Sequence, residues 1–250
     1  MMRNTGSIIT GSLAYRFIQR DTEPWRPGDI CIVTTFGSYH RVTRFLKAMF
    51  PAARVRHWDP PSGALRTSIF PYHGSTSMEA TDFRVRIFQT RTHDVFYPLP
   101  FFTSTHLMNA LTSDALVSAY PDLTFHQKGI YTNHAEFFTL RSTDHTSEEL
   151  LDRDFQFFED AKDASSLAAA CRSYGACAKV DRFLGDRWTL VLPVGLESVR
   201  EAAGVLESRE VTAWRIGGSP CDNDHCFGFS SRSLITTLSW VENRPTGVFV

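Results

Sequence analysis

The order of elements predicted between residues 7 and 34 constrains the fold of this chain more than any other feature. An apolar run over residues 7–10 ends at Gly11 and Ser12, and apolar residues near helical spacing follow over 12–20. A loop with two prolines and a glycine then leads to residues 30–34, a β-branched apolar run typical of a buried strand. The segment therefore predicts a strand, a helix with Ser12 as its N-cap, and a second strand, in that order.

A second helix is predicted over residues 41–50, because apolar residues recur there at the i, i+3, i+4, i+7 spacing of one helix face. These face residues are Val42, Phe45, Leu46 and Met49. Residues 51–80 are rich in Pro, Ser, Gly and Thr, so little regular structure is predicted there apart from an apolar stretch at 68–70. The other predicted elements are a half-exposed strand over 82–90, one or two helices over 103–120, a helical segment over 147–175, strands near 188–194 and 211–218, and a strand or helix near 230–241.

Composition and charge narrow the class of protein. With 42% hydrophobic and 21% charged residues, the chain has the composition of an ordinary globular protein. The formal net charge of −1 provides no global basic field, so a nucleic-acid partner is not supported. No apolar run approaches the ~20 residues of a membrane span, so no membrane partner is predicted. The odd number of cysteines, 5, fits a reducing compartment, so an intracellular location, cytoplasm or nucleus, is expected.

A sequence motif follows the first predicted strand. "GSLAYRFI" begins at Gly11, and "GDICIV" places Asp29 at the start of the second strand. This pattern of strand, Gly-Ser, helix and Asp-apolar-X-apolar strand resembles the nucleotidyltransferase fold superfamily, as in polymerase-β-like enzymes. With the later stretches "FFTSTHLMNALTSDALVSAYPDLTF" and "VDRFLGDRWTLVLP", it is similar to nucleotidyltransferase-like proteins of mushroom-forming fungi. The resemblance covers residues 6–135 and extends more weakly over 136–250.

The resemblance implies a specific chemistry. In the superfamily, the Gly-Ser turn holds the triphosphate of a nucleotide through backbone N–H groups and a hydroxyl. Carboxylates at positions i and i+2 of the second strand point to the same side and hold Mg²⁺, with a third carboxylate from a neighbouring strand. Two metal ions then stabilise the in-line displacement at phosphorus.

This chain departs from that pattern at two of the three carboxylate positions. Position 31 is Cys31, a soft ligand poorly matched to Mg²⁺. The strand that should supply the third acid has Arg84 and Arg86, and Asp82 lies only at its entrance. We therefore expect a degenerate nucleotidyltransferase-like protein in which Asp29 is a vestigial metal ligand. At most it binds a nucleotide or phosphate weakly, through Gly11, Ser12, Arg84 and Arg86.

Other interpretations of the same residues remain open. An active nucleotidyltransferase could use a rearranged Mg²⁺ site that recruits Asp82 or Asp94, and a non-catalytic module could bind an unknown protein partner. Gly11 and Ser12 could simply form a turn and a helix cap. Cys31 could be a small buried hydrophobic residue, and Arg84 and Arg86 could lie on a solvated strand face.

A second cluster of candidate ligands lies in the C-terminal half. Two cysteine pairs about fifty residues apart suggest a tetrahedral zinc site, although their internal spacings are wider than in a zinc knuckle. The four candidate ligands are Cys171, Cys177, Cys221 and Cys226. Ordinary buried or surface thiols are the alternative explanation.

Together, the predicted elements and the resemblance give an α/β (α+β) fold. We expect a small, mixed, twisted sheet with flanking helices over residues 1–135, forming a nucleotidyltransferase-like domain. Residues 136–250 are expected to form an accessory α+β region packed against it.

Overall fold

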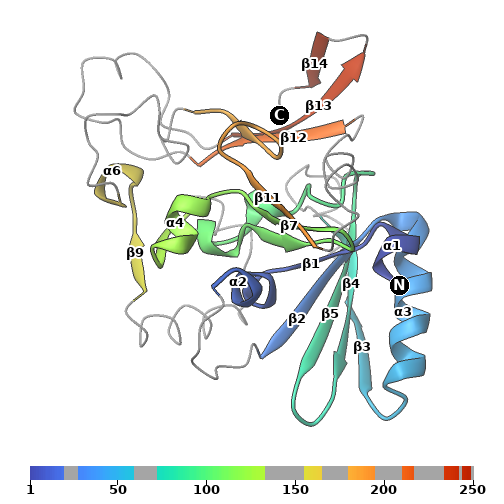
Figure 1. Ribbon diagram of the computed structural model, residues 1–250. Helices are drawn as coiled ribbons and strands as arrows, with labels where there is room; N and C mark the ends of the chain where they lie inside the picture. Colours follow the sequence, from blue (N-terminus) through green and yellow to red (C-terminus); the bar gives the residue numbers. More distant parts are fainter. Residues whose placement is uncertain are drawn as a thin grey trace.

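The protein has a mixed α+β architecture built around one large sheet, as seen in a computed structural model (Figure 1). The residues that the structure describes are 1–19, 28–58, 72–132, 155–164, 180–194, 210–216, 234–241 and 244–248. The helices in these ranges are α1 (Met2–Thr5), α2 (Ser12–Gln19), α3 (Phe36–Met49), α4 (Pro121–Phe125) and α6 (Ala161–Ala164), with the 3-10 turns η2 (Leu99–Phe101) and η3 (Thr105–Leu107). No helix of this described part is long and apolar enough to cross a membrane.

Eight strands form the large sheet in the order β11-β7-β6-β1-β2-β5-β4-β3. They are β1 (Ile8–Thr10), β2 (Asp29–Thr34), β3 (Arg54–Trp58), β4 (Tyr72–Glu79), β5 (Arg84–Thr90), β6 (Asn109–Leu111), β7 (Ala115–Ser118) and β11 (Leu190–Pro193). Strands β2 and β5 are parallel, whereas the other neighbouring strands in this sheet are antiparallel. The parallel pair brings segments more than fifty residues apart into direct register.

Two smaller sheets accompany the large one. Strands β10 (Arg182–Phe183), β12 (Glu210–Arg215), β13 (Leu234–Val241) and β14 (Arg244–Val248) form a four-stranded antiparallel sheet. Strands β8 (Lys128–Ile130) and β9 (Gln156–Phe158) form a parallel pair. In Figure 1, β12, β13 and β14 lie beyond β11 and β7, on the side away from the free end of β2.

Helix α3 covers one face of the large sheet. Its buried residues Val42 and Leu46 form a hydrophobic cluster with Ile32 of β2 and with Val85 and Ile87 of β5. Because side chains alternate along a strand, the odd-numbered residues of β5 face α3 and the even-numbered residues face the other side. The two sides of β5 therefore carry different chemistry.

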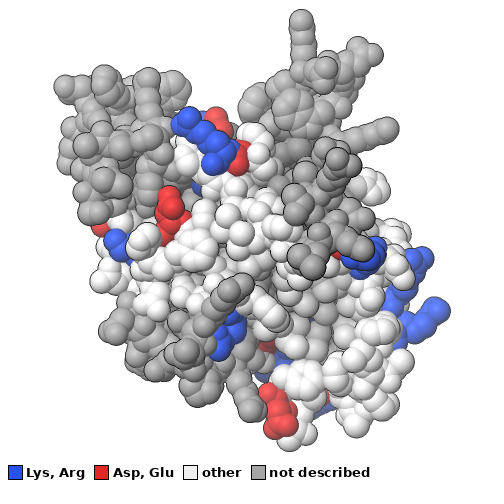
Figure 2. Space-filling view, in the orientation of Figure 1, with Lys and Arg blue, Asp and Glu red and all other residues white. Residues whose placement is uncertain are grey.

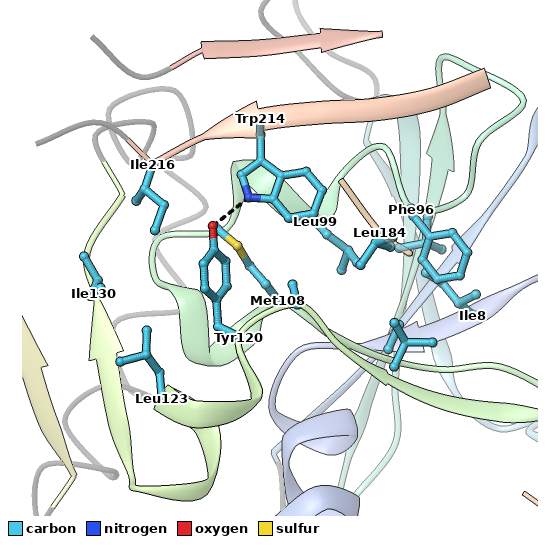
Figure 3. Packing of buried hydrophobic residues seen from close by; sticks show 14 of the residues in the cluster. Ile8, Phe96, Leu99, Met108, Tyr120, Leu123, Ile130, Leu184, Trp214 and Ile216 are labelled. Atoms are coloured by element: carbon cyan, nitrogen blue, oxygen red, sulfur yellow. Dashed lines mark hydrogen bonds between the residues drawn. The ribbon is translucent and has the colours of Figure 1, made fainter. Parts of the chain in front are cut away.

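The larger core lies on the opposite side and joins the sheet to elements from the C-terminal half. Figure 3 shows Trp214 pointing from β12 toward Tyr120, just before α4. The Trp214 indole Nε1–H donates a hydrogen bond of 2.8 Å to the Tyr120 hydroxyl, and both residues are buried. Strand β11 also pairs with β7 of the large sheet. Residues from both sides of the boundary predicted near residue 135 thus contribute to one sheet and one core, and the boundary itself stays a prediction.

Several sequence predictions are confirmed by the observed elements. The strand, turn, helix and strand predicted over residues 7–34 correspond to β1, α2 and β2. Helix α3 begins earlier than the predicted residue 41, and two members of its predicted apolar face, Phe45 and Met49, are 43% and 54% exposed. The α+β class is confirmed, although the sheet is larger than the small sheet expected.

The helices predicted over residues 103–120 are wrong. This segment contains only the short turn η3 before two strands, β6 and β7, joined by a tight turn. Within the turn the Thr112 N–H donates to the Ala115 carbonyl, and the Thr112 hydroxyl accepts from the backbone N–H of Ala115. Every residue of β7 is buried, so the strand shows no alternation, and a short apolar run of this kind is indistinguishable from a buried helix by pattern.

Two further differences have the same origin in weak local patterns. Strands β3 and β4 lie in the segment where little regular structure was expected, because β4 is built mainly from small polar residues. Residues 156–158 form strand β9 within the predicted helical segment. The strands expected near 188–194 and 211–218 correspond to β11 and β12, and 234–241 is a strand.

Candidate functional site

The turn between β1 and α2 is formed by Gly11. Its φ of +74° lies in the left-handed region that glycine adopts most readily. The Gly11 carbonyl accepts the first helical hydrogen bond, 3.0 Å from the Tyr15 nitrogen, so Gly11 and not Ser12 occupies the N-cap position. Ser12 is the first residue of α2 and is half-buried. The expected cap at Ser12 is therefore shifted by one residue.

Strand β2 lies directly beside this turn. Cys31 pairs with Thr10 of β1, and a Cβ atom added to Gly11 would lie 3.8 Å from the Cys31 sulfur. On its other side, Cys31 is in register with Arg86 of β5, and Asp29 is in register with Arg84. Residues in register on neighbouring strands share a sheet face. The geometry thus brings together Gly11, Asp29 and both arginines named by the sequence.

The Asp29 carboxylate is engaged by the two arginines of β5. The Arg86 guanidinium donates a hydrogen bond to Asp29 Oδ2 and forms an ion pair with it. Arg84 Nε lies 3.8 Å from Asp29 Oδ1 and 3.7 Å from Glu79 Oε1. The Arg86 side chain is 10% exposed, compared with 24% for Asp29 and 41% for Arg84. Arg86 is therefore the buried cation of the site, and Arg84 extends toward solvent.

Two neighbours of this ion pair, Cys31 and Tyr72, are uncharged at neutral pH. Burial raises the pKa of the Cys31 thiol to about 11, an effect that outweighs the opposing influence of Arg86. Burial also raises the pKa of the Tyr72 hydroxyl well above its ordinary value. Cys31 consequently stays a neutral thiol, which is a poor ligand for a hard cation such as Mg²⁺.

The two acids that the sequence offered to complete a metal site, Asp82 and Asp94, do not converge on Asp29. Asp82 is exposed, in the turn before β5. Asp94 is 5% exposed, and its carboxylate accepts hydrogen bonds from the Phe96 N–H and the Thr212 hydroxyl, beyond the opposite end of β5. Within the described ranges, no three or more His, Cys, Asp or Glu side chains gather where they could hold a metal ion. The donor set beside Asp29 does not fit a pair of Mg²⁺ ions, because a guanidinium occupies the carboxylate that should bind them.

The four cysteines of the predicted zinc site, Cys171, Cys177, Cys221 and Cys226, lie outside the described residues. The zinc site stays a prediction.

The sequence indicated that Arg84 and Arg86 would lie near the site but missed the contact of Arg86 with Asp29. The signal that could have found it is the parallel register of β2 and β5, which places positions 29 and 84, and 31 and 86, side by side. Comparisons with known proteins add no further constraint, because no protein-family model matches the sequence and a search of curated proteins gives no match.

Proposed function

We propose that the chain is a nucleotidyltransferase-like protein that no longer uses paired metal ions, and that Arg86 takes the place of a cation beside Asp29. The observation that carries this proposal is the hydrogen-bonded ion pair between the Arg86 guanidinium and the Asp29 carboxylate. The order β1, Gly11 turn, α2 and β2 is consistent with the resemblance, since it sets Asp29 on the strand next to the turn.

The ion pair works against metal binding for an energetic reason. A divalent ion at Asp29 would have to displace the Arg86 guanidinium, which is largely buried and would lose its partner. Leaving a buried charge unpaired costs about 3–5 kcal/mol. The gain from coordinating an ion through a single carboxylate is small, because Mg²⁺ needs several oxygen ligands from protein or phosphate.

The same site keeps features that suit an anion. The first turn of α2, next to Gly11, carries backbone N–H groups that have no acceptor within the helix, and Arg84, with 41% of its side chain exposed, can approach a phosphate. We expect weak binding of a nucleotide or phosphate there, without transfer chemistry. The alternative of an active enzyme that recruits Asp94 is less well supported, since both oxygens of that carboxylate are engaged elsewhere.

A gain-of-binding experiment tests the proposal. Electron paramagnetic resonance of free Mn²⁺ would measure uptake by the parent chain and by a Cys31→Asp/Arg86→Asp variant, which restores three acids around one sheet face. We expect no uptake by the parent and uptake of Mn²⁺ by the variant. Arg54→Asp/Met49→Asp is the matched control, because it changes the charge equally at exposed positions.

Two results would contradict the proposal. One is stoichiometric Mn²⁺ binding by the parent chain that disappears in Asp29→Asn. The other is metal-dependent transfer of a nucleotide by the parent. Equal Mn²⁺ uptake by the two substituted variants would show that added negative charge, and not the position of the acids, explains the gain.

A further inference from the structure

A cleft lies on the face of the large sheet opposite to Asp29, between α3 and strands β3 to β5. Its volume is about 680 Å³. Gln89 of β5 lines it, and this odd-numbered residue faces α3 as Val85 and Ile87 do. The lining residues are Tyr39, His40, Thr43, Arg44, Lys47, His57, Ser75 and Gln89. The cleft is therefore separate from the Asp29 site, which lies behind the sheet.

The rim of the cleft is basic. Arg44 and Lys47 lie one helical turn apart on α3, and both are exposed. Neither forms an ion pair with any residue of the described part of the chain. None of the described residues that line the cleft is acidic, so no carboxylate in the lining compensates the positive charges of Arg44 and Lys47.

The surrounding sequence strengthens this charge. Residues 30–58 contain no Asp or Glu, although the chain as a whole has 27 acidic residues against 26 Lys and Arg. The cations in that segment are Arg41, Arg44, Lys47, Arg54 and Arg56. In Figure 2, Lys and Arg side chains gather at the right-hand edge of the molecule, where α3 lies in Figure 1. Arg41, Arg44 and Lys47 lie on α3 beside the cleft, whereas Arg54 and Arg56 alternate with Val55 and His57 of β3 and lie on the other face of the sheet, where Arg56 pairs with Glu79. The positive charge at the cleft therefore comes from α3.

The floor of the cleft carries an unsatisfied donor. Thr43 is 7% exposed, and its hydroxyl oxygen is buried and has no hydrogen-bond partner among the residues that the structure describes. A threonine within a helix can satisfy its hydroxyl on a preceding backbone carbonyl, but Thr43 does not. Leaving such a group unpaired is unfavourable, so a ligand that accepts its hydrogen bond would gain affinity. Gln89, 9% exposed, supplies a second polar group to the floor.

We propose that this cleft binds a phosphorylated small molecule. The phosphate lies between Arg44 and Lys47 and accepts a hydrogen bond from the Thr43 hydroxyl, and the polar body of the ligand faces Gln89 and Tyr39. The volume of about 680 Å³ lies within the range of about 300–1,000 Å³ found for small-molecule sites. A small ligand is favoured over a nucleic acid because the two cations that line the cleft lie one helical turn apart and the net charge of the chain is −1.

Calorimetric titration with inorganic pyrophosphate tests the site in the full chain. Arg44→Gln/Lys47→Gln is expected to weaken pyrophosphate binding at least tenfold. Arg41→Gln/Arg54→Gln removes the same charge from exposed positions that do not line the cleft, and it should change the affinity less than threefold. Absence of pyrophosphate binding, or equal losses in the two variants, would overturn the proposal. So would tighter binding of a duplex RNA, with a steep salt dependence, than of pyrophosphate.

Thr43→Val separates binding from folding, because the two side chains have nearly the same shape. Its hydroxyl has no hydrogen-bond partner in the described part of the chain, so the midpoint of thermal unfolding is expected to stay the same or rise. Pyrophosphate affinity is expected to fall about tenfold, the loss of one hydrogen bond to a charged group. An unchanged affinity would refute the role of Thr43. Asp29→Asn should leave the affinity of this cleft for pyrophosphate unchanged. The cleft proposal and the function proposed for the Asp29 site can therefore fail independently of each other.

Discussion

The ion pair between Asp29 and Arg86 can be tested by a double-mutant cycle. Asp29→Asn keeps the shape of the side chain but leaves the Arg86 guanidinium, 10% exposed, beside Arg84 without a negative partner. Breaking a fully buried pair costs about 3–5 kcal/mol, and because Asp29 is 24% exposed we expect about 2–3 kcal/mol. Arg86→Met should cost less, about 1 kcal/mol, since Asp29 reaches water and keeps Arg84 nearby.

The double variant Asp29→Asn/Arg86→Met should be no less stable than Asp29→Asn alone. The resulting coupling energy is at least about 1 kcal/mol, the cost of Arg86→Met alone, which identifies a direct interaction. Urea unfolding followed by circular dichroism near neutral pH would measure all four free energies of unfolding. The pair Asp181 and Arg215, in which the carboxylate is 63% exposed, provides a control cycle, with an expected coupling of at most about 0.5 kcal/mol.

The reasoning would be refuted if Asp29→Asn cost less than about 0.5 kcal/mol and the coupling were near zero. That outcome would mean that the carboxylate is not held by Arg86 and remains available to a metal ion. A rise in the stability of the parent chain with millimolar Mg²⁺, absent in Asp29→Asn, would point to the same conclusion.

Three further predictions concern the Gly11 turn, the buried His106 ring and the larger core. Gly11→Ala should cost about 1 kcal/mol in urea unfolding because of the φ of +74°, whereas Gly37→Ala in α3 should be neutral or stabilising by about 0.5 kcal/mol. Burial lowers the pKa of His106 from 6.5 to about 3, so the folded state keeps the imidazole neutral while the unfolded state takes up a proton. The free energy of unfolding should therefore fall as the pH drops below 6.5, by up to about 1.4 kcal/mol per pH unit. His106→Phe should flatten this pH dependence. An unchanged slope in the variant would contradict the burial of a neutral ring. Trp214→Phe should cost about 1–3 kcal/mol through the lost hydrogen bond to Tyr120 and the lost ring volume, and the cost should shrink in a Tyr120→Phe background.

The segments that the sequence predicted well are those with strong local signals. The run from β1 through Gly11 to α2 and β2 depends on apolar patterning and one glycine, which act over a few residues. The hairpin of β6 and β7 has no such signal, because its buried residues read as one face of a helix. A helix or a strand is recognisable when its apolar residues repeat with a period of 3.6 or 2.0 residues. A short segment that is buried on both sides shows neither period.

Placement of the arginines on a neighbouring strand was also accessible from the sequence, since the alternation over 82–90 put Arg84 and Arg86 on one face. The burial of Arg86 could not be predicted from the sequence, because β5 is buried on both sides by elements far away in the chain. The cleft beside α3 was missed for a similar reason. Its basic rim is visible as a stretch without acids, but its floor is made by β4 and β5, which come later in the chain.

The available side chains follow from the amino-acid sequence alone: one acid at position 29, a thiol at 31, two arginines at 84 and 86, and a turn that requires glycine at 11. The partners of these side chains depend on how the strands pair in the folded protein. The parallel pairing of β2 with β5 joins residues more than fifty positions apart, and it is this register that sets a guanidinium against the Asp29 carboxylate. Strand pairing over such distances depends on the burial of whole faces of the sheet, and no short stretch of sequence contains that information.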